Sequence, residues 1–137
     1  MPLIDRDTAR LFQSRFYSFV DGIVRSFEVR VPEGEGLSVV VLIATQDSTR
    51  PDDDRWVCVR LVVKKVESFC CADANSPENR QTYSGVLSSR VNVCWFGDSV
   101  GLELGNFLVP PRDMAELKTS KLFVVGRSVE WTVEPYC

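Results

Sequence analysis

Apolar and polar side chains alternate with a period of two residues along most of this chain, and this alternation constrains the fold more than any other feature. A period of two is that of a β-strand with one face in a core and the other towards solvent. In the segment 56–66, every second residue from Val57 to Val63 is Val or Leu. Residues 37–45 are apolar on both faces, as in a strand that is covered on both sides. We predict six strands, at residues 23–31, 37–45, 56–66, 86–96, 100–104 and 122–133.

Turns and loops of polar residues separate the predicted strands. The Pro and Gly residues of 32–36 and the Gly97-Asp98 pair are typical of hairpin turns. Residues 46–55 and 72–83 are longer polar loops, and we expect them to make contacts with other molecules. Gly126, inside the last predicted strand, indicates a bulge or a close approach of another segment.

One segment, from Leu3 to Val20, has the spacing of an amphipathic helix, with Asp7 or Thr8 placed to cap it. Its apolar stripe consists of Leu11, Phe12, Phe16, Phe19 and Val20. A second, short helix is expected to end at Leu117, with Asp113 as its cap. The chain is therefore predicted to be a single domain, residues 1–137, and mainly β. We expect an antiparallel sheet, a sandwich or a partly open barrel with one N-terminal helix.

Charge and composition exclude some functions. The 16 Lys and Arg residues are scattered among 19 Asp and Glu residues, for a net charge of −3, which disfavours nucleic-acid binding. No segment has the roughly 20 apolar residues of a membrane span, and the first residues do not resemble a secretory signal. The five cysteines are an odd number, which favours reduced thiols and a cytoplasmic location.

The chain contains no histidine. This excludes Ser-His-Asp and Cys-His arrangements, histidine metal sites and the commonest general base. Catalysis by carboxylates, Lys, Tyr or Cys alone is left open but disfavoured. Acidic residues on the strands, such as Glu103 and Glu130, are expected mostly on solvent-facing sides. We assign no catalytic, cofactor-binding or metal-binding residue and expect no cofactor.

Three groups of residues are candidates for metal, redox or nucleic-acid sites. Cys70 and Cys71 are adjacent, and neighbours in a strand point to opposite faces, so two small apolar residues at a strand end, one of them facing inward, are favoured over a metal or redox site. Residues 52–54 are all Asp but lack the spacing of a calcium loop, which favours a solvated acidic loop. Lys64, Lys65 and Arg60, on a strand with Trp56, are interpreted as protection of a sheet edge rather than as a nucleic-acid site.

Three segments carry a family resemblance. Residues 19–26 (FVDGIVRS) resemble an opening motif F-x-D-[GS]-x-[VI]-x-S, residues 56–66 (WVCVRLVVKKV) resemble W-x-x-V-x-L-x-F-x-x-V, and residues 123–131 (FVVGRSVEW) resemble a closing strand F-x-V-x-[CG]-x-S-[VI]-E. In this order they are similar to small all-β bacterial proteins grouped with the immunity proteins of polymorphic toxin systems. The chain has Val20 where those proteins often carry His, and Val63 where an aromatic is usual. The resemblance implies a protein that binds and blocks a protein partner without a cofactor.

Two functions are consistent with these observations. The first is non-enzymatic binding of a protein partner, of which self-association into a homodimer is a simpler form. Sheet faces that would pair in such a dimer contain Val40, Leu42, Val62 and Trp95. The second is binding or conversion of a small molecule in a pocket of the sheet. Such a pocket would be lined by Phe27, Trp56, Trp95 and Trp131.

Overall fold

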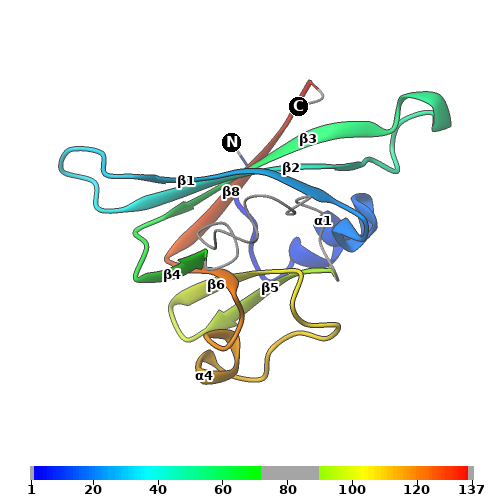
Figure 1. Ribbon diagram of the computed structural model, residues 1–137. Coiled ribbons are helices and arrows are strands. Elements are labelled where there is room, and N and C mark those ends of the chain that lie inside the picture. Colours follow the sequence, from blue (N-terminus) through cyan, green and yellow to red (C-terminus); the bar gives the residue numbers. More distant parts are fainter. Residues whose placement is uncertain (1, 72–89, 136–137) are drawn as a thin grey trace, which may run out of the picture.

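A computed structural model describes residues 2–71 and 90–135 and shows a β-sandwich of two four-stranded antiparallel sheets (Figure 1). The first sheet has the strand order β1-β2-β3-β8, with bounds β1 Ile23–Arg30, β2 Ser38–Gln46, β3 Trp56–Lys64 and β8 Ser128–Glu134. The second has the order β4-β7-β6-β5, with bounds β4 Ser68–Cys71, β7 Leu122–Gly126, β6 Ser99–Leu104 and β5 Val91–Phe96. The helical elements are α1 Ala9–Arg15, η1 Tyr17–Phe19, η2 Asp52–Asp54 and α4 Met114–Leu117. The predicted fold class is confirmed, and the architecture is a sandwich.

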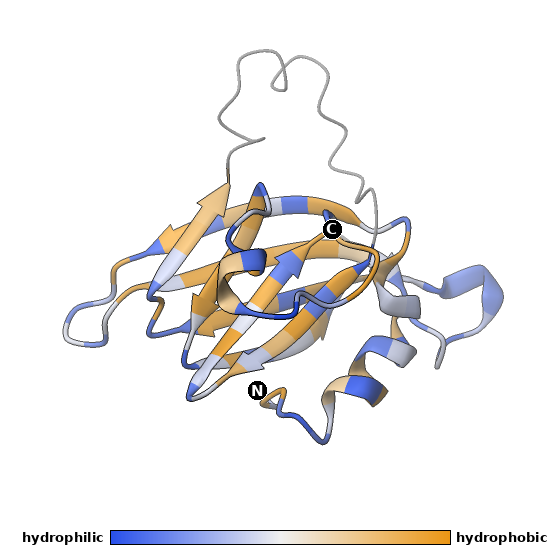
Figure 2. Ribbon diagram, turned by 90° about the horizontal axis from the view of Figure 1, so that it is seen from below, coloured by the Kyte–Doolittle hydropathy of each residue, from blue (hydrophilic) through white to orange (hydrophobic). Residues whose placement is uncertain are grey.

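The inner faces of the sheets are those that the alternation predicts. Val57, Val59, Leu61 and Val63 are fully buried in the core, as are Val39, Val41 and Ile43 of β2. In Figure 2 the strands are mostly coloured as hydrophobic, whereas several of the turns that join them are polar. β1 departs from a strict alternation of faces, because its pairing with β2 shifts between Val24 and Ser26. This bulge pairs Ile23 with Ala44 on the outer face and turns Val24 into the core with Phe27.

The long predicted strand 122–133 is two strands that belong to different sheets. The chain passes from β7 to β8 at Gly126, where an added Cβ would lie 2.6 Å from the carbonyl oxygen of Lys64. The Arg127 N–H donates to the same oxygen at 2.9 Å. Gly126 therefore lies at a close approach of another backbone segment, which is one of the two predicted alternatives, the other being a bulge. β4 lacks a counterpart among the predicted strands, and residues 72–89, which include the second polar loop and the start of a predicted strand, lie outside the described residues.

The predicted N-terminal helix is shorter than its sequence pattern. α1 spans Ala9–Arg15, and left-handed backbone at Tyr17, Ser18 and Phe19 follows it. Thr8 occupies the N-cap position, but the side chain that accepts N–H groups there is Asp5. The buried stripe consists of Phe12, Phe16 and Phe19, whereas Leu11 is 75% exposed and Val20 is 53% exposed.

The aromatic stripe closes an opening between the two sheets. The rings of Phe12 and Phe16 lie 5.2 and 5.7 Å from the ring of Trp131 on β8. Gln13 donates its side-chain amide to the carbonyl of Val91, at the edge strand β5. In Figure 1, α1 lies beside the space between the two layers. The helix thus joins the free edges of both sheets and covers the core.

A buried carboxylate holds the connection between β6 and β7. Glu103 is fully buried, contrary to the expected solvent-facing position. It accepts hydrogen bonds from Asn92 Nδ2 at 3.0 Å, the Asn106 N–H at 2.8 Å and Ser120 Oγ at 2.9 Å. The predicted short helix, α4, lies in this connection, and its cap is confirmed because Asp113 accepts the Glu116 N–H at 2.8 Å. Leu117 of α4 packs with Phe123 in a second apolar cluster.

Two glycine-to-alanine substitutions test the packing. Gly126→Ala is expected to destabilise the fold by about 1–3 kcal/mol, because the new methyl group meets backbone that cannot move without breaking the turn between sheets. Gly101→Ala serves as the comparison, since its Cβ would meet the flexible end of the Leu117 side chain at 2.6 Å and the Phe96 ring at an ordinary contact distance of 3.5 Å, and no backbone. Urea denaturation measures both, and an equal or smaller cost at Gly126 would contradict the packing described.

Candidate functional site

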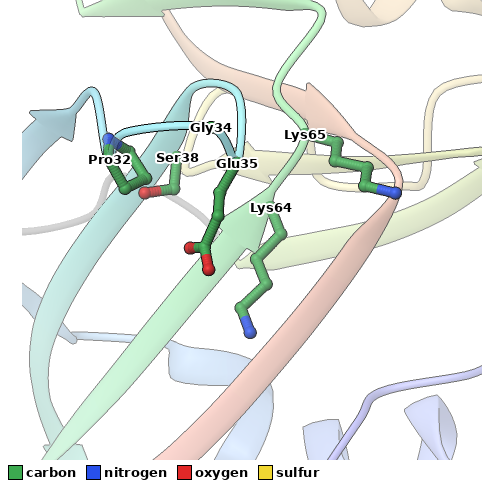
Figure 3. Close-up of a pocket in the computed structure, with 6 residues that line it drawn as sticks. All are labelled: Pro32, Gly34, Glu35, Ser38, Lys64 and Lys65. Carbon is green, nitrogen blue, oxygen red and sulfur yellow. The ribbon is translucent and has the colours of Figure 1, made fainter.

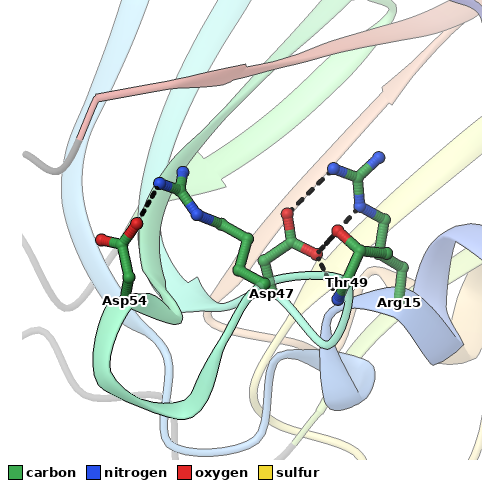
Figure 4. Close-up of polar contacts among 5 residues, drawn as sticks. Arg15, Asp47, Thr49 and Asp54 are labelled. Carbon is green, nitrogen blue, oxygen red and sulfur yellow. Dashed lines mark hydrogen bonds and ion pairs between the residues drawn. The ribbon is translucent and has the colours of Figure 1, made fainter.

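The loop of residues 47–55 is fixed by the side chain of Asp47, which is only 1% exposed (Figure 4). Arg15 of α1 donates from Nε to Oδ1 at 3.1 Å and from Nη2 to Oδ2 at 2.9 Å. Thr49 donates its N–H and its hydroxyl to Oδ1 at 3.0 and 2.7 Å. The Ser48 N–H donates to the carbonyl of Arg15 at 2.8 Å. The loop is therefore joined to α1 by side chains and by backbone.

The environment of Asp47 favours its charged form. Burial alone would raise the pKa of this carboxyl, but the hydrogen bonds from Arg15 and Thr49 outweigh burial and lower the pKa to about 2. The hydrogen bond to Asp47 in turn raises the pKa of Arg15. The guanidinium also lies over the rings of Phe16 and Trp131, at 5.1 and 5.4 Å from their centroids. Arg15 thus contacts the loop and the aromatic stripe at once.

A second arginine organises the other end of the loop. Arg55 donates from Nη1 to the hydroxyl of Tyr17 at 2.8 Å and from Nε to the carbonyl of Arg50 at 3.2 Å. Its Nη2 lies 2.7 Å from Oδ1 of Asp52, and Arg50 pairs with Asp54. All three nitrogens of this guanidinium are therefore engaged, and η2 is held as a rigid part of the loop.

The segment after α1 has an unusual backbone. Tyr17, Ser18, Phe19 and Asp21 all have positive φ values, between 52° and 63°. Non-glycine residues in this region are strained, and such strain persists only where surrounding contacts impose it. Here burial of Phe19 and the bond from Arg55 to Tyr17 impose it. The result is a tight turn that directs Tyr17 and Val20 outwards.

This turn and the ends of β2 and β3 form a shallow hollow of about 340 Å³, lined by Tyr17, Val20, Asp21, Gln46 and Arg55. Trp56 faces the same side, because it is the register partner of Gln46. Tyr17 is 43% exposed and Trp56 is 40% exposed. We call these six residues, Tyr17, Val20, Asp21, Gln46, Arg55 and Trp56, the η1 surface.

A second hollow, of about 290 Å³, is more apolar and includes Arg15 in its lining. Its lining consists of Pro2, Leu3, Thr8, Leu11, Phe12, Arg15 and Trp131. Leu3 and Leu11 stand exposed at its rim. The carbonyl of Pro2 accepts the Trp131 N–H, so the N-terminal residues are fixed against β8.

A third hollow lies between the β1–β2 hairpin and the end of β3 (Figure 3). Its Lys64 and Lys65 side chains point in different directions, and Lys64 pairs with Glu130 at 3.2 Å. Trp56 lies at the opposite end of β3 from Lys64, so the basic and aromatic residues weighed as a nucleic-acid site do not share one patch. The described residues thus give no convergent group of cations here. The interpretation as edge protection is also wrong, because β3 lies between β2 and β8 and is an inner strand.

The four residues proposed for a pocket of the sheet do not converge on one, although Trp131 lines the 290 Å³ hollow. Phe27, Trp95 and Trp131 pack against the core, and Trp56 lies on the outer face of β3. Sheet faces suggested for a homodimer offer little surface, since Val40 and Val62 are already buried and Trp95 packs inwards. Within residues 2–71 and 90–135, no group of three acidic or cysteine residues is arranged to hold a metal ion. In the same ranges, no helix is long and apolar enough to cross a membrane.

The four cysteines within the described residues fall into three environments, those of the β4 pair, of Cys94 and of Cys58. Cys71 packs against the main core and Cys70 against the second cluster, so the adjacent thiols face opposite sides of β4 as predicted. Burial, and next to it the charge of Glu103, raises the pKa of the Cys94 thiol to about 11. Cys58 is disulfide-bonded, so the expectation of wholly reduced thiols is wrong for this residue.

Known proteins give no further guide to this site. No family model matches the chain, and no curated protein or solved structure matches it. The resemblance to immunity proteins therefore stays a prediction. Neither the pairing of Arg15 with Asp47 nor the exposure of Tyr17 was predicted from sequence, although Asp47-Ser48-Thr49 after an apolar strand is a signal for a side-chain-stabilised turn.

Removing the carboxylate of Asp47 should weaken the fold. Asp47→Asn is expected to lower the free energy of unfolding by about 1–3 kcal/mol at pH 7, because Arg15 loses its charged partner. The loss stays moderate because the side chain of Arg15 is 34% exposed and water solvates it in part. The pKa of Asp47 is lower than its ordinary value of 3.8, so its contribution is present above about pH 4 and is lost as the pH falls towards 2. The difference in free energy of unfolding between wild type and Asp47→Asn, measured by urea denaturation, should therefore become smaller as the pH falls from about 4 towards 2. Asp53→Asn is the control, and an equal effect there would contradict the assignment.

Thiol labelling tests the three cysteine environments. In the native protein at pH 7.5, N-ethylmaleimide is expected to modify Cys70 and Cys71 but not Cys94, whose pKa of about 11 leaves almost no thiolate. Cys58 should react only after denaturation and reduction. Peptide mass spectrometry identifies the modified residues, and labelling of Cys94 at the rate of Cys70 would be inconsistent with its burial.

Proposed function

We propose that this chain is a non-enzymatic protein-binding domain that engages its partner through the η1 surface. The observation that carries the proposal is the composition of that surface. It contains an exposed Tyr on a turn of fixed geometry, and an Arg and an exposed Trp at the start of β3. These are the three residue types that dominate measured binding hot spots. Large rigid side chains lose little conformational entropy on binding, which favours affinity.

The fixed loop supports the same proposal. Arg15, Asp47 and Arg55 hold the loop and the turn through the contacts described, so little ordering is needed when a partner binds. Backbone strain of the kind found at Tyr17, Ser18 and Phe19 clusters at functional sites. The resemblance to immunity proteins extends the proposal to a finer form, in which the domain occludes a toxin. Residues 19–26, which carry part of that resemblance, include Asp21 of the η1 surface.

The cytoplasmic location predicted from sequence has one observation against it. Disulfides are rare in cytosolic proteins, and Cys58 is disulfide-bonded. The oxidation state of Cys58 in extracts prepared with a thiol-blocking reagent decides between a reducing and an oxidising compartment.

The binding proposal is tested with the products of the genes adjacent to this one, co-expressed with the tagged chain. One of them is expected to co-purify with it in a defined complex by size-exclusion chromatography with light scattering. Trp56→Ala and Val20→Ser are expected to weaken that complex about tenfold or more, as truncation of a hot spot does. Both residues are exposed, so neither variant should unfold.

Phe69→Ala is the matched control, because Phe69 is 41% exposed and lies on the second sheet. Equal weakening by Phe69→Ala, or no complex with any adjacent product, would argue against the proposal. A concentration-dependent homodimer that Trp56→Ala dissociates would instead support self-association, the alternative form of protein binding.

A further inference from the structure

The charges around the η1 surface are unevenly matched. Arg15 pairs with Asp47, Arg50 with Asp54 and Arg55 with Asp52, so each arginine of this region has one carboxylate. Two further carboxylates, those of Asp21 and Asp53, form no ion pair with a described residue. The surface is therefore left with excess negative charge, which attracts a cationic partner.

The hollow of the η1 surface selects between a cation and an anion. Among the described residues that line it, the basic side chain is Arg55, which already donates to Tyr17, to Arg50 and to Asp52, and the carboxylate of Asp52 balances its charge. Asp21, in contrast, lines the hollow with a carboxylate that pairs with no described cation. The electrostatics of the hollow therefore favour a positive group.

The remaining lining fits a long basic side chain. Val20 provides an apolar wall for the aliphatic stem. The ring of Tyr17, whose centroid lies 5.9 Å from the guanidinium carbon of Arg55, provides an aromatic surface beside which a second planar cation stacks. Gln46 adds an amide oxygen as an acceptor beside Asp21. A guanidinium matches this set better than an ammonium, because it is planar and donates in two directions at once.

We propose that the hollow receives an arginine side chain of the partner, with its guanidinium on Asp21 and Gln46 and its face on Tyr17. This inference rests on the proposed function and names the chemistry of the partner. Charge-assisted hydrogen bonds to a carboxylate are about twice as strong as neutral ones, so the charge supplies much of the recognition. The partner surface that docks here is therefore basic.

The probe for this inference is N-acetyl-arginine amide, titrated into the isotope-labelled protein and followed by NMR. Amide shifts are expected at Tyr17, Asp21 and Gln46. N-acetyl-citrulline amide, which has nearly the same shape without the charge, is expected to bind about fivefold more weakly or worse. Asp21→Asn should reduce the affinity for arginine to a similar degree. Asparagine tolerates the positive φ of Asp21, so this variant keeps the turn.

Asp53→Asn is the matched control, since it removes the other unmatched carboxylate without changing the hollow. Equal binding of arginine and citrulline, shifts confined to other surfaces, or no saturable binding at 100 mM probe, about the weakest affinity of interest, would overturn the inference. If the partner complex is weakened by Trp56→Ala but not by Asp21→Asn, the proposed function stands and the arginine inference is rejected. If no partner complex forms but N-acetyl-arginine amide binds as expected, the arginine site stands and the proposed function is rejected.

Discussion

The ion pair between Arg15 and Asp47 is the contact on which the rest of this surface depends. It joins the end of α1 to the start of the loop 47–55, and the same guanidinium covers the rings of Phe16 and Trp131. A nearly fully buried carboxylate is costly unless its oxygens are satisfied, and Asp47 has donors on both. The pair therefore fixes where the loop begins relative to the core, and Arg55 fixes where it ends.

The strained turn that follows α1 is maintained by the core beneath it. Left-handed backbone at three successive non-glycine residues costs free energy at each position. Burial of Phe16 and Phe19, which are fully enclosed beside Phe12 and Trp131, offsets this cost. The exposed face of the turn is thus a consequence of how the aromatic stripe packs.

Periodicity predicted the layers of this fold but not its surface. The faces of β3 and the position of the cap at Asp113 follow from local patterns, which are sufficient where one side of a strand is buried. The bulge near Val24 and the change of sheet at Gly126 depend on a neighbouring strand, so no local pattern in β1 or β7 contains them. The pairing of Arg15 with Asp47 joins residues 32 apart in sequence and is invisible to spacing. Leu11 and Val20 were assigned to the apolar stripe because they are apolar, although the turn at Tyr17 directs Val20 outwards and Leu11 lies off the buried face.

The sheet edges also bear on which surface is available for binding. Residues near the N-terminus pair with β8 through Leu3 and Glu130, and Gln13 bonds to Val91 of β5, so one edge of each sheet is partly covered. β1, an outer strand of the first sheet, has a bulge and an exposed pair of Glu28 and Arg30, both of which discourage addition of a further strand. Its Phe27 ring lies 6.2 Å from that of Phe69 on β4, so the two remaining edges are held against each other. A partner therefore gains more from the fixed aromatic and charged groups of the η1 surface than from strand pairing, because these groups are already held in place before it binds.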